Sequence, residues 1–242
     1  MIEPFFFGSE PLFGVYHPAQ DVDADKLVVI CAPLFDEYRR SYRAMADFAA
    51  ACSEKGYHVL RFDYLGTGDS YGELAEVDTI NEWLTNIDDA IEEGCALSGA
   101  DQVTLVGVRF GAALAAGAQH PAVMQRILWD PIANGLDYTR WLDAVDQWQR
   151  DDHTKMAKII GDRGPDQDES QFLLNPALRA SIEAWTFPTD LLKVHLVFSQ
   201  QNSDAQLENY NGISVDNGYD WPPYDEGLIR SVNAFTQMLK YL

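Results

Sequence analysis

The chain has 242 residues, a length that suits one α/β domain with or without an insertion. Hydrophobic residues make up 47% and charged residues 23%, with no biased tract, so the composition is that of a globular protein. Seventeen Lys and Arg residues against 38 Asp and Glu residues give a formal net charge of −21, which repels nucleic acid and anionic membrane surfaces. The charge argues against a nucleic-acid-binding protein. A well-solvated surface explains it better than a specific cationic partner.

The cysteines and the first residues indicate a protein of a reducing compartment. Three cysteines lie far apart without a C-x-x-C pair, which argues against a disulfide framework and a cysteine zinc site: Cys31, Cys52 and Cys95. The chain starts with the acidic Glu3, no basic cluster and no long apolar run, unlike a signal peptide or a membrane span. We therefore predict a cytoplasmic protein with no membrane span, no metal site and no cofactor.

The first elements predict a hairpin followed by a strand, a helix and a second strand. Short aromatic runs at 4–7 and 12–17 flank GSEP, which suits an antiparallel hairpin of edge strands. The run KLVVICAP at 26–33 is apolar up to a proline, the pattern of a central strand covered on both faces. Apolar residues at three-to-four spacing predict a helix over 39–55, and YHVLRFDY at 57–64 is the next strand.

Strands and helices continue to alternate up to residue 131. After the glycine-rich turn region LGTGDSYGE, a helix is expected at 77–97 and a strand at 102–108. A helix at 110–119 and a strand at 126–131 follow. This alternation predicts an α/β fold with a mostly parallel central sheet covered by helices on both faces. Ligands of such sheets bind at the carboxyl ends of the strands.

Residues 132–190 break the rhythm with two helical stretches, around 138–160 and 170–185, joined by the polar link GDRGPDQDES. We interpret them as a helical lid inserted over the carboxyl ends of the strands. The predicted organisation is a core of residues 1–131 and 191–242 with the lid at 132–190. In the second part of the core, LLKVHLVFS and GISVDN are expected strands, and an amphipathic helix is expected at 226–242.

The stretch DQVTLVGVRFGAALAA predicts a strand that turns sharply into a helix. Its turn reads Gly107, Val108, Arg109, Phe110, Gly111, and resembles the nucleophile elbow Gly-x-Ser-x-Gly of the α/β-hydrolase superfamily. ICAPLF and D-x-x-G-x-G-x-S, at 63–70, are similar to lipase-like and S33 aminopeptidase-like members. The segments PFFFGS, LFGVYHP and LWDPI look like hydrolase-like proteins associated with bacterial exosortase and exopolysaccharide gene clusters. The resemblance implies the α/β-hydrolase fold.

The resemblance also shows where the catalytic triad fails. A guanidinium has no lone pair for attack, so Arg109 cannot replace the serine nucleophile. Asp204 lies near the family's acid position, but residues 202–242 contain no histidine to act as the base. We expect structural roles for the five histidines and burial for the three cysteines. The histidines are His17, His58, His120, His153 and His195.

Two roles remain open for Arg109. With the N–H groups of Phe110 and of Leu34 or Phe35, which occupy the family's oxyanion-loop position, it could bind a carboxylate, phosphate or sulfate. Alternatively it forms an internal ion pair, because an unpaired buried charge is costly. The candidate partners at the same strand ends are Asp63, Asp130, Asp204 and Asp220. The tryptophans of the 132–190 region are expected in the lid core or along a sugar or acyl pocket: Trp141, Trp148 and Trp185.

These observations predict a non-catalytic or weakly active accessory protein that binds a small anionic, acyl or glycosyl ligand. The ligand-binding candidates are Arg109, Phe110, Leu34, Phe35, Asp130 and Asp220. One alternative is an esterase-type or acyl-transfer enzyme with a non-standard site, in which Asp204 or Asp220 is the general base. Another is an interaction module in a polysaccharide-related assembly. The sequence leaves a protein partner or a homodimer open.

Overall fold

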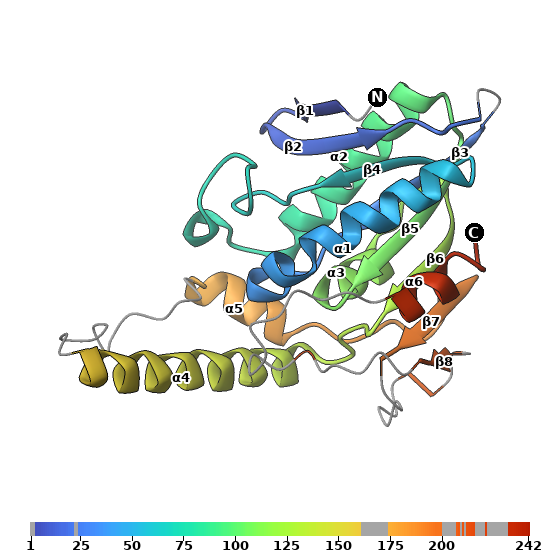
Figure 1. The fold of residues 1–242 in the computed structure, drawn as a ribbon. Coiled ribbons are helices and arrows are strands. Elements are labelled where there is room, and N and C mark those ends of the chain that lie inside the picture. Colours follow the sequence, from blue (N-terminus) through green and yellow to red (C-terminus); the bar gives the residue numbers. More distant parts are fainter. Residues whose placement is uncertain are drawn as a thin grey trace.

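A computed structural model describes residues 3–21, 24–160, 174–199, 207–208, 210, 212–215, 221 and 232–242. These residues form an eight-stranded sheet in the order β1-β2-β4-β3-β5-β6-β7-β8 (Figure 1). The strands are β1 (Glu3–Phe7), β2 (Leu12–His17), β3 (Lys26–Cys31), β4 (His58–Phe62), β5 (Gln102–Val108), β6 (Val123–Trp129), β7 (Val194–Phe198) and β8 (Gly212–Ser214).

The pairing confirms the predicted mostly parallel sheet. β1 and β2 form an antiparallel hairpin, and β2 pairs antiparallel with β4, whereas all pairs from β4 to β8 are parallel. The apolar run of β3 lies between β4 and β5, as its burial on both faces requires. Only β1 of the hairpin is an edge strand. The prediction of two edge strands was wrong for β2, because β4 covers its second side.

Helices cover both faces of the sheet (Figure 1). Side chains of α1 and α6 pack into the core on one face, and those of α2 and α3 pack on the other. The helices around the sheet are α1 (Phe35–Glu54), the 3₁₀ turn η1 (Leu74–Glu76), α2 (Ile80–Ser98), α3 (Phe110–Gly117) and α6 (Val232–Met238). Residues 226–231 of the predicted terminal helix lie outside the described residues.

Two helix starts differ from the expectation. α2 begins at Ile80, three residues late, because Thr79 and Glu82 form a capping box that fixes the first turn there. α1 begins at Phe35, four residues before the predicted start, and its first turn contains the acidic Asp36 and Glu37. This early start matters for the site, because it places Glu37 in the first turn of α1.

Two further helices connect β6 to β7, and Figure 1 shows the longer one lying along one end of the domain. They are α4 (Gly135–Ile160) and α5 (Pro176–Glu183). The guanidinium of Arg179 donates to both oxygens of Asp143, at 2.8 and 2.6 Å, and so joins α5 to α4. The link GDRGPDQDES lies outside the described residues, and the division into core and lid stays a prediction. Within the described residues, no helix is both long and apolar enough to cross a membrane.

Candidate functional site

The elbow between β5 and α3 has the sharp geometry that its glycines predict. Arg109 has φ 55° and ψ −122°, a strained conformation for a residue with a side chain, costing roughly 1–3 kcal/mol. A Cβ on Gly107 would overlap Ala112, and one on Gly111 would overlap the carbonyl oxygen of Ala32. The turn therefore brings α3 against the end of β3, and it directs the side chain of Arg109 out beyond the end of β5.

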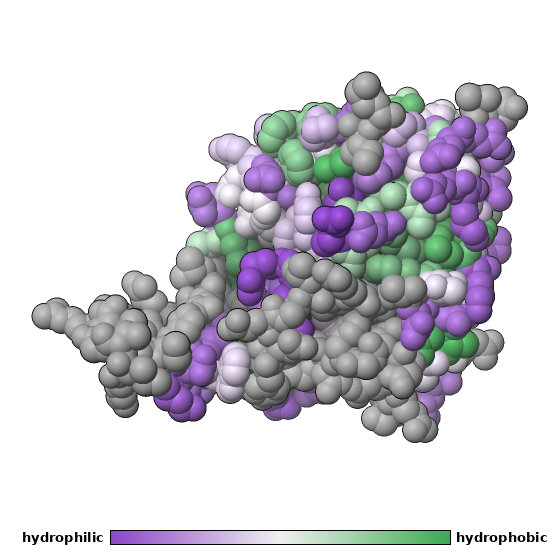
Figure 2. Space-filling view, in the orientation of Figure 1, coloured by the Kyte–Doolittle hydropathy of each residue, from purple (hydrophilic) through white to green (hydrophobic). Residues whose placement is uncertain are grey.

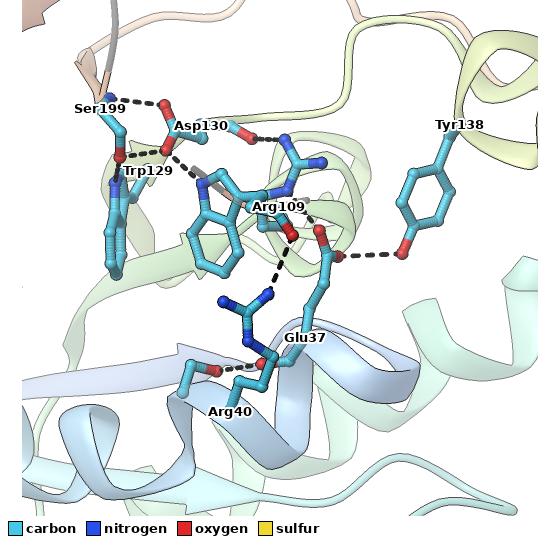
Figure 3. Close-up of polar contacts among 9 residues, drawn as sticks. Glu37, Arg40, Arg109, Trp129, Asp130, Tyr138 and Ser199 are labelled. Carbon is cyan, nitrogen blue, oxygen red and sulfur yellow. Dashed lines mark hydrogen bonds and ion pairs between the residues drawn. The ribbon is translucent and has the colours of Figure 1, made fainter. Parts of the chain in front are cut away.

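The guanidinium of Arg109 forms a buried ion pair with Glu37 (Figure 3). Its Nε–H donates to Oε1 of Glu37 at 2.6 Å, and the hydroxyl of Tyr138 on α4 donates to Oε2 at 3.1 Å. The Glu37 side chain is 2% exposed and that of Arg109 is 15% exposed. Residues from the turn between β5 and α3, from α1 and from α4 thus meet at one point.

Burial and charge act in opposite directions on the two partners. Burial raises the pKa of Glu37, and the nearby Arg109, Tyr138 and Arg40 only partly oppose this rise. Burial lowers the pKa of Arg109, but the charge and hydrogen bond of Glu37 more than offset it, so the pKa of Arg109 is raised. Arg109 stays a cation at any accessible pH, and Glu37 is the partner that can take up a proton.

Aromatic rings enclose the guanidinium. Its central carbon lies 5.6 Å from the ring centroid of Trp141 and 5.2 Å from that of Trp221, within range of cation–π attraction. Tyr138 stacks between Phe110 and Trp141, with centroid distances of 5.0 and 5.7 Å. α4 therefore covers the elbow with rings that limit the access of water.

Asp130, directly after β6, anchors the neighbouring wall. Its carboxylate accepts the backbone N–H of Ser199 at 2.8 Å, the hydroxyl of Ser199 at 2.5 Å and the indole N–H of Trp221 at 2.6 Å. Asp130 has φ 45°, and its carbonyl oxygen lies 3.5 Å from Nη1 of Arg109. Nη1 of Arg40 donates to the carbonyl of Trp221 at 3.0 Å. Asp130 thus acts mainly by holding Trp221 over the guanidinium.

The predicted oxyanion-loop residues line the same strand ends. Leu34 and Phe110 are buried, and Phe35, with φ 55°, stacks on Tyr138 at 6.5 Å. A cavity of about 200 Å³, lined mostly by apolar surface, adjoins this loop on the side of β4. The loop therefore borders a space large enough for a small ligand, although Arg109 itself is not among the residues that line it.

The expectation of an internal ion pair holds in kind, but the direct partner, Glu37, is one that the sequence reasoning missed. Of the predicted partners, Asp130 contributes through its charge, which helps to raise the pKa of Arg109. Asp63 accepts from the Tyr38 hydroxyl and the Asp69 backbone instead of Arg109, because Tyr38 of α1 lies over the end of β4. Asp204 and Asp220 lie outside the described residues. Glu37 had one signal in the sequence: it follows β3, the strand that pairs with β5, by six residues.

The tryptophans and cysteines have mixed outcomes. Of the three tryptophans expected in the lid, Trp141 lies at the guanidinium, whereas Trp185 donates to the carbonyl of Ile132 and packs against Gly117. Cys31 and Cys52 are buried, whereas Cys95 is only partly buried and packs against the edge of the core. Burial raises the pKa of Cys31 and Cys52 to about 12, which makes both poor nucleophiles.

The histidines with described side chains make structural contacts away from the elbow. His17 contacts Arg61, His58 contacts Tyr16, His120 contacts the Ala122 backbone and His195 stacks on Tyr241. These contacts lie in the body of the strands or toward their amino ends, whereas Arg109 follows the carboxyl end of β5. His153 is on α4, and its side chain is outside the described residues.

We expect His17 to make stability depend on pH. Burial, together with the nearby Arg61, lowers the pKa of His17 from 6.5 to about 4. As the pH falls from 6.5 towards 4, the unfolded chain binds a proton before the folded protein does, so up to about 3 kcal/mol of stability is lost. Urea unfolding at pH 7, 5.5 and 4.5 should show a weaker loss in His17→Gln than in the wild type. An unchanged pH dependence would contradict this assignment.

The strand order, the elbow after the central strand and the helices on both faces define the α/β-hydrolase fold. Residues 23–182 match the family model described as serine aminopeptidase, S33, and the chain belongs to this family. No curated protein matches the chain by sequence.

Solved structures share the fold at low sequence identity. The Bottromycin epimerase BotH in complex with Bottromycin A2 aligns with a TM-score of 0.57 and 16% identity over 99% of this chain and 96% of that chain. A hypothetical protein from Pseudomonas aeruginosa aligns with a TM-score of 0.55 and 15% identity, over 82% of this chain and 77% of that chain. The α/β-hydrolase domain-containing protein 10 from mouse aligns with a TM-score of 0.51 and 18% identity, over 82% of this chain and 77% of that chain.

Proposed function

We propose that this protein binds a small molecule through a single carboxylate at Arg109, under α4, and does not hydrolyse esters by a serine mechanism. The observation that carries this proposal is that only some of the N–H groups of the Arg109 guanidinium have an acceptor among the described residues. Its Nε–H is bonded to Glu37, and its Nη1 is 3.5 Å from the Asp130 carbonyl. Within the described part of the chain, Nη2 has no acceptor.

The ion pair and a ligand are compatible, because a guanidinium has five N–H donors in a fixed fork. The buried Arg40 and the half-buried Arg109 lie near the buried Glu37 and the half-buried Asp130, so the charges of these four residues already balance. A further dianion would be strongly disfavoured there. A monoanion is the better fit, and the apolar cavity beside the oxyanion loop favours a carboxylate with an apolar body.

The residue types support binding without acyl transfer. Arginine occupies the position of the serine nucleophile, and a guanidinium forms no acyl-enzyme. The elbow backbone and the start of α3 are kept, and a helix start of this kind suits an anion. The fold itself is not restricted to hydrolysis, since one of the solved structures that it matches over nearly its whole length is described as an epimerase. The absence of a triad is part of this proposal.

The other interpretations of the sequence stay predictions. An enzyme that uses Asp204 or Asp220 as its base would act from residues outside the described part. The relation to exosortase-associated proteins also stays a prediction. An interaction module in a polysaccharide-related assembly would bind its partners through the outer surface of the fold and not through Arg109. Both carboxylate oxygens of Glu37 already accept hydrogen bonds, which makes binding a better description of this site than general-base catalysis.

The test is a titration with benzoate and hexanoate, followed by tryptophan fluorescence. Trp141 and Trp221 flank the guanidinium, so occupation of the site should change their emission. Arg109→Lys keeps the charge but loses the planar fork, and we expect at least ten-fold weaker binding. The matched control is Arg43→Lys on the exposed side of α1, which should bind within two-fold of the wild type. Equal affinity in Arg109→Lys would overturn the proposal.

Proton uptake and labelling complete the test. A bound carboxylate next to Glu37 should raise the pKa of Glu37 further, so binding should be tighter at pH 6 than at pH 8. A serine-directed fluorophosphonate should not label the protein. Arg109→Ser should leave the rate of p-nitrophenyl ester cleavage at background, because no base is supplied. Labelling of an elbow hydroxyl, or a clear gain of esterase activity, would show a working triad.

A further inference from the structure

We propose a second anion site, for a small phosphate-bearing molecule, at the opposite edge of the sheet from Arg109. A cavity of about 250 Å³ lies where the central parallel strands begin. Its walls come from consecutive neighbours in the sheet: Lys26 starts β3, Gln102 starts β5, Gln125 is near the start of β6 and Lys193 precedes β7. None of the residues described at the Arg109 site lines this cavity.

Lysines gather at this corner of a strongly acidic chain, although Asp25 and Asp101 directly precede Lys26 and Gln102 in the sequence. The sequence has six lysines: Lys26, Lys55, Lys155, Lys158, Lys193 and Lys240. Lys26 and Lys193 line the cavity, Lys55 donates to the carbonyl of Leu239, and Lys240 precedes Tyr241 in the cavity wall. Among the described residues, no Asp or Glu side chain lines the cavity. On the side of the molecule where β3 begins, Figure 2 shows many hydrophilic residues, with hydrophobic ones beside them near the end of the chain.

The two lysines are placed to hold one ligand from both sides. β3 and β7 are separated by β5 and β6, so the backbones of Lys26 and Lys193 are about 14 Å apart. Both side chains are exposed and long enough to lean towards the middle, over the starts of β5 and β6. There, the Gln125 side-chain amide donates to the Thr104 hydroxyl oxygen at 3.1 Å. The hydroxyl proton of Thr104 is then a donor for a ligand.

The chemistry of the walls selects the class of ligand. Lysine ammonium groups are compact point charges that suit phosphate, and a balanced pair of them matches a dianion. Tyr57, Met124 and Tyr241 add apolar surface, and the ammonium of Lys26 lies 5.8 Å from the ring centroid of Tyr57. The cavity, of about 250 Å³, has room for several waters and therefore for a small molecule. A phosphate monoester with a small organic body fits these limits, whereas the charge-balanced Arg109 site disfavours it.

The experiment uses glycerol 3-phosphate, with inorganic phosphate as a second probe, on the full chain. Calorimetric titration gives the affinity, and acetylation of lysines by an N-hydroxysuccinimide ester, read by mass spectrometry, gives the location. We expect glycerol 3-phosphate to slow acetylation of Lys26 and Lys193 at least five-fold and that of Lys155 on α4 less than two-fold. Lys155 is also exposed, so it controls for general effects of the anion.

Variants separate this site from the Arg109 site. Lys26→Gln with Lys193→Gln should weaken phosphate binding at least ten-fold. Lys155→Gln and Arg109→Lys should bind phosphate within two-fold of the wild type. The proposal is overturned by equal protection of all three lysines, by no binding at millimolar phosphate, or by loss of phosphate binding in Arg109→Lys alone. Exposed lysines tolerate glutamine, so misfolding would not obscure the result.

Discussion

Replacing Arg109 with methionine is expected to lower the free energy of unfolding by about 3–5 kcal/mol, because it leaves a buried carboxylate without its cation. Glu37 is 2% exposed, and Arg109 donates to it at 2.6 Å. Tyr138 would still donate to the other oxygen, and Arg40 would stay nearby, but neither replaces the lost N–H. The cost should therefore exceed that of removing an exposed arginine by several-fold.

The double variant Arg109→Met with Glu37→Gln tests whether charge is the cause. Glutamine keeps the size of Glu37 and can still accept from Tyr138, while its neutral amide avoids a buried charge. We expect the double variant to recover at least half of the lost stability, because removing both charges together also removes the penalty of their burial. If the single and double variants are equally unstable, packing and not charge explains the effect.

The pH dependence of the single variant gives an independent check. Burial already raises the pKa of Glu37, and loss of Arg109 removes the main group that opposes this rise. A folded-state pKa above the unfolded value means that stability is highest at low pH and is lost as the pH rises through the folded-state pKa. Urea unfolding should therefore show a smaller deficit for Arg109→Met at pH 5 than at pH 8. A deficit independent of pH would contradict an ionised Glu37 as its cause.

The sequence indicates the elbow well because its signals are local. Apolar runs mark β3 and β5, and the two glycines around Arg109 mark a turn that only small residues permit. Their spacing predicts an arginine directed out from the strand end, and the structure has Arg109 there. The need to neutralise a buried cation also predicts an ion pair of some kind.

The partners of Arg109 are harder to predict because their contacts are not local. Glu37 lies 72 positions before Arg109, and nothing in one sequence separates it from the other acidic residues near strand ends. Trp221 bonds to Asp130 across 91 positions and to Arg40 across 181. Such contacts depend on which strands become neighbours and where α1 begins. The predicted helix does not include the first turn of α1, which contains Asp36 and Glu37.

Gly111→Ala is expected to destabilise the protein by at least about 3 kcal/mol, although helix propensity predicts the opposite. Gly111 lies inside α3, where alanine gains roughly 1 kcal/mol over glycine. A Cβ there would overlap the carbonyl oxygens of Ala32 and Cys31, which are backbone atoms at the end of β3. Because neither α3 nor β3 can move without disturbing the sheet core, the steric cost should outweigh the propensity gain.

Gly94→Ala is the matched control, since Gly94 is also a buried glycine inside a helix, α2. The nearest atoms to its added Cβ belong to the side chain of Leu27, which can change rotamer, so we expect a cost below that of Gly111→Ala by at least 1 kcal/mol. Urea unfolding of both variants measures the difference. Equal costs would mean that the close approach of α3 to β3 is not specially constrained.

The same glycine connects stability to the proposed function. The close approach of Gly111 to the carbonyls of Ala32 and Cys31 fixes the start of α3 against the end of β3. In our proposal, it also keeps the N–H of Phe110 near the loop of Leu34 and Phe35. A substitution that pushes α3 away from β3 should increase the distances between the N–H donors of the proposed site. Folded Gly111→Ala should therefore bind hexanoate at least five-fold more weakly than the wild type. Gly94→Ala leaves this geometry untouched and should bind normally. Normal binding by a destabilised Gly111→Ala would separate the elbow's packing from anion recognition and leave Arg109 alone responsible for it.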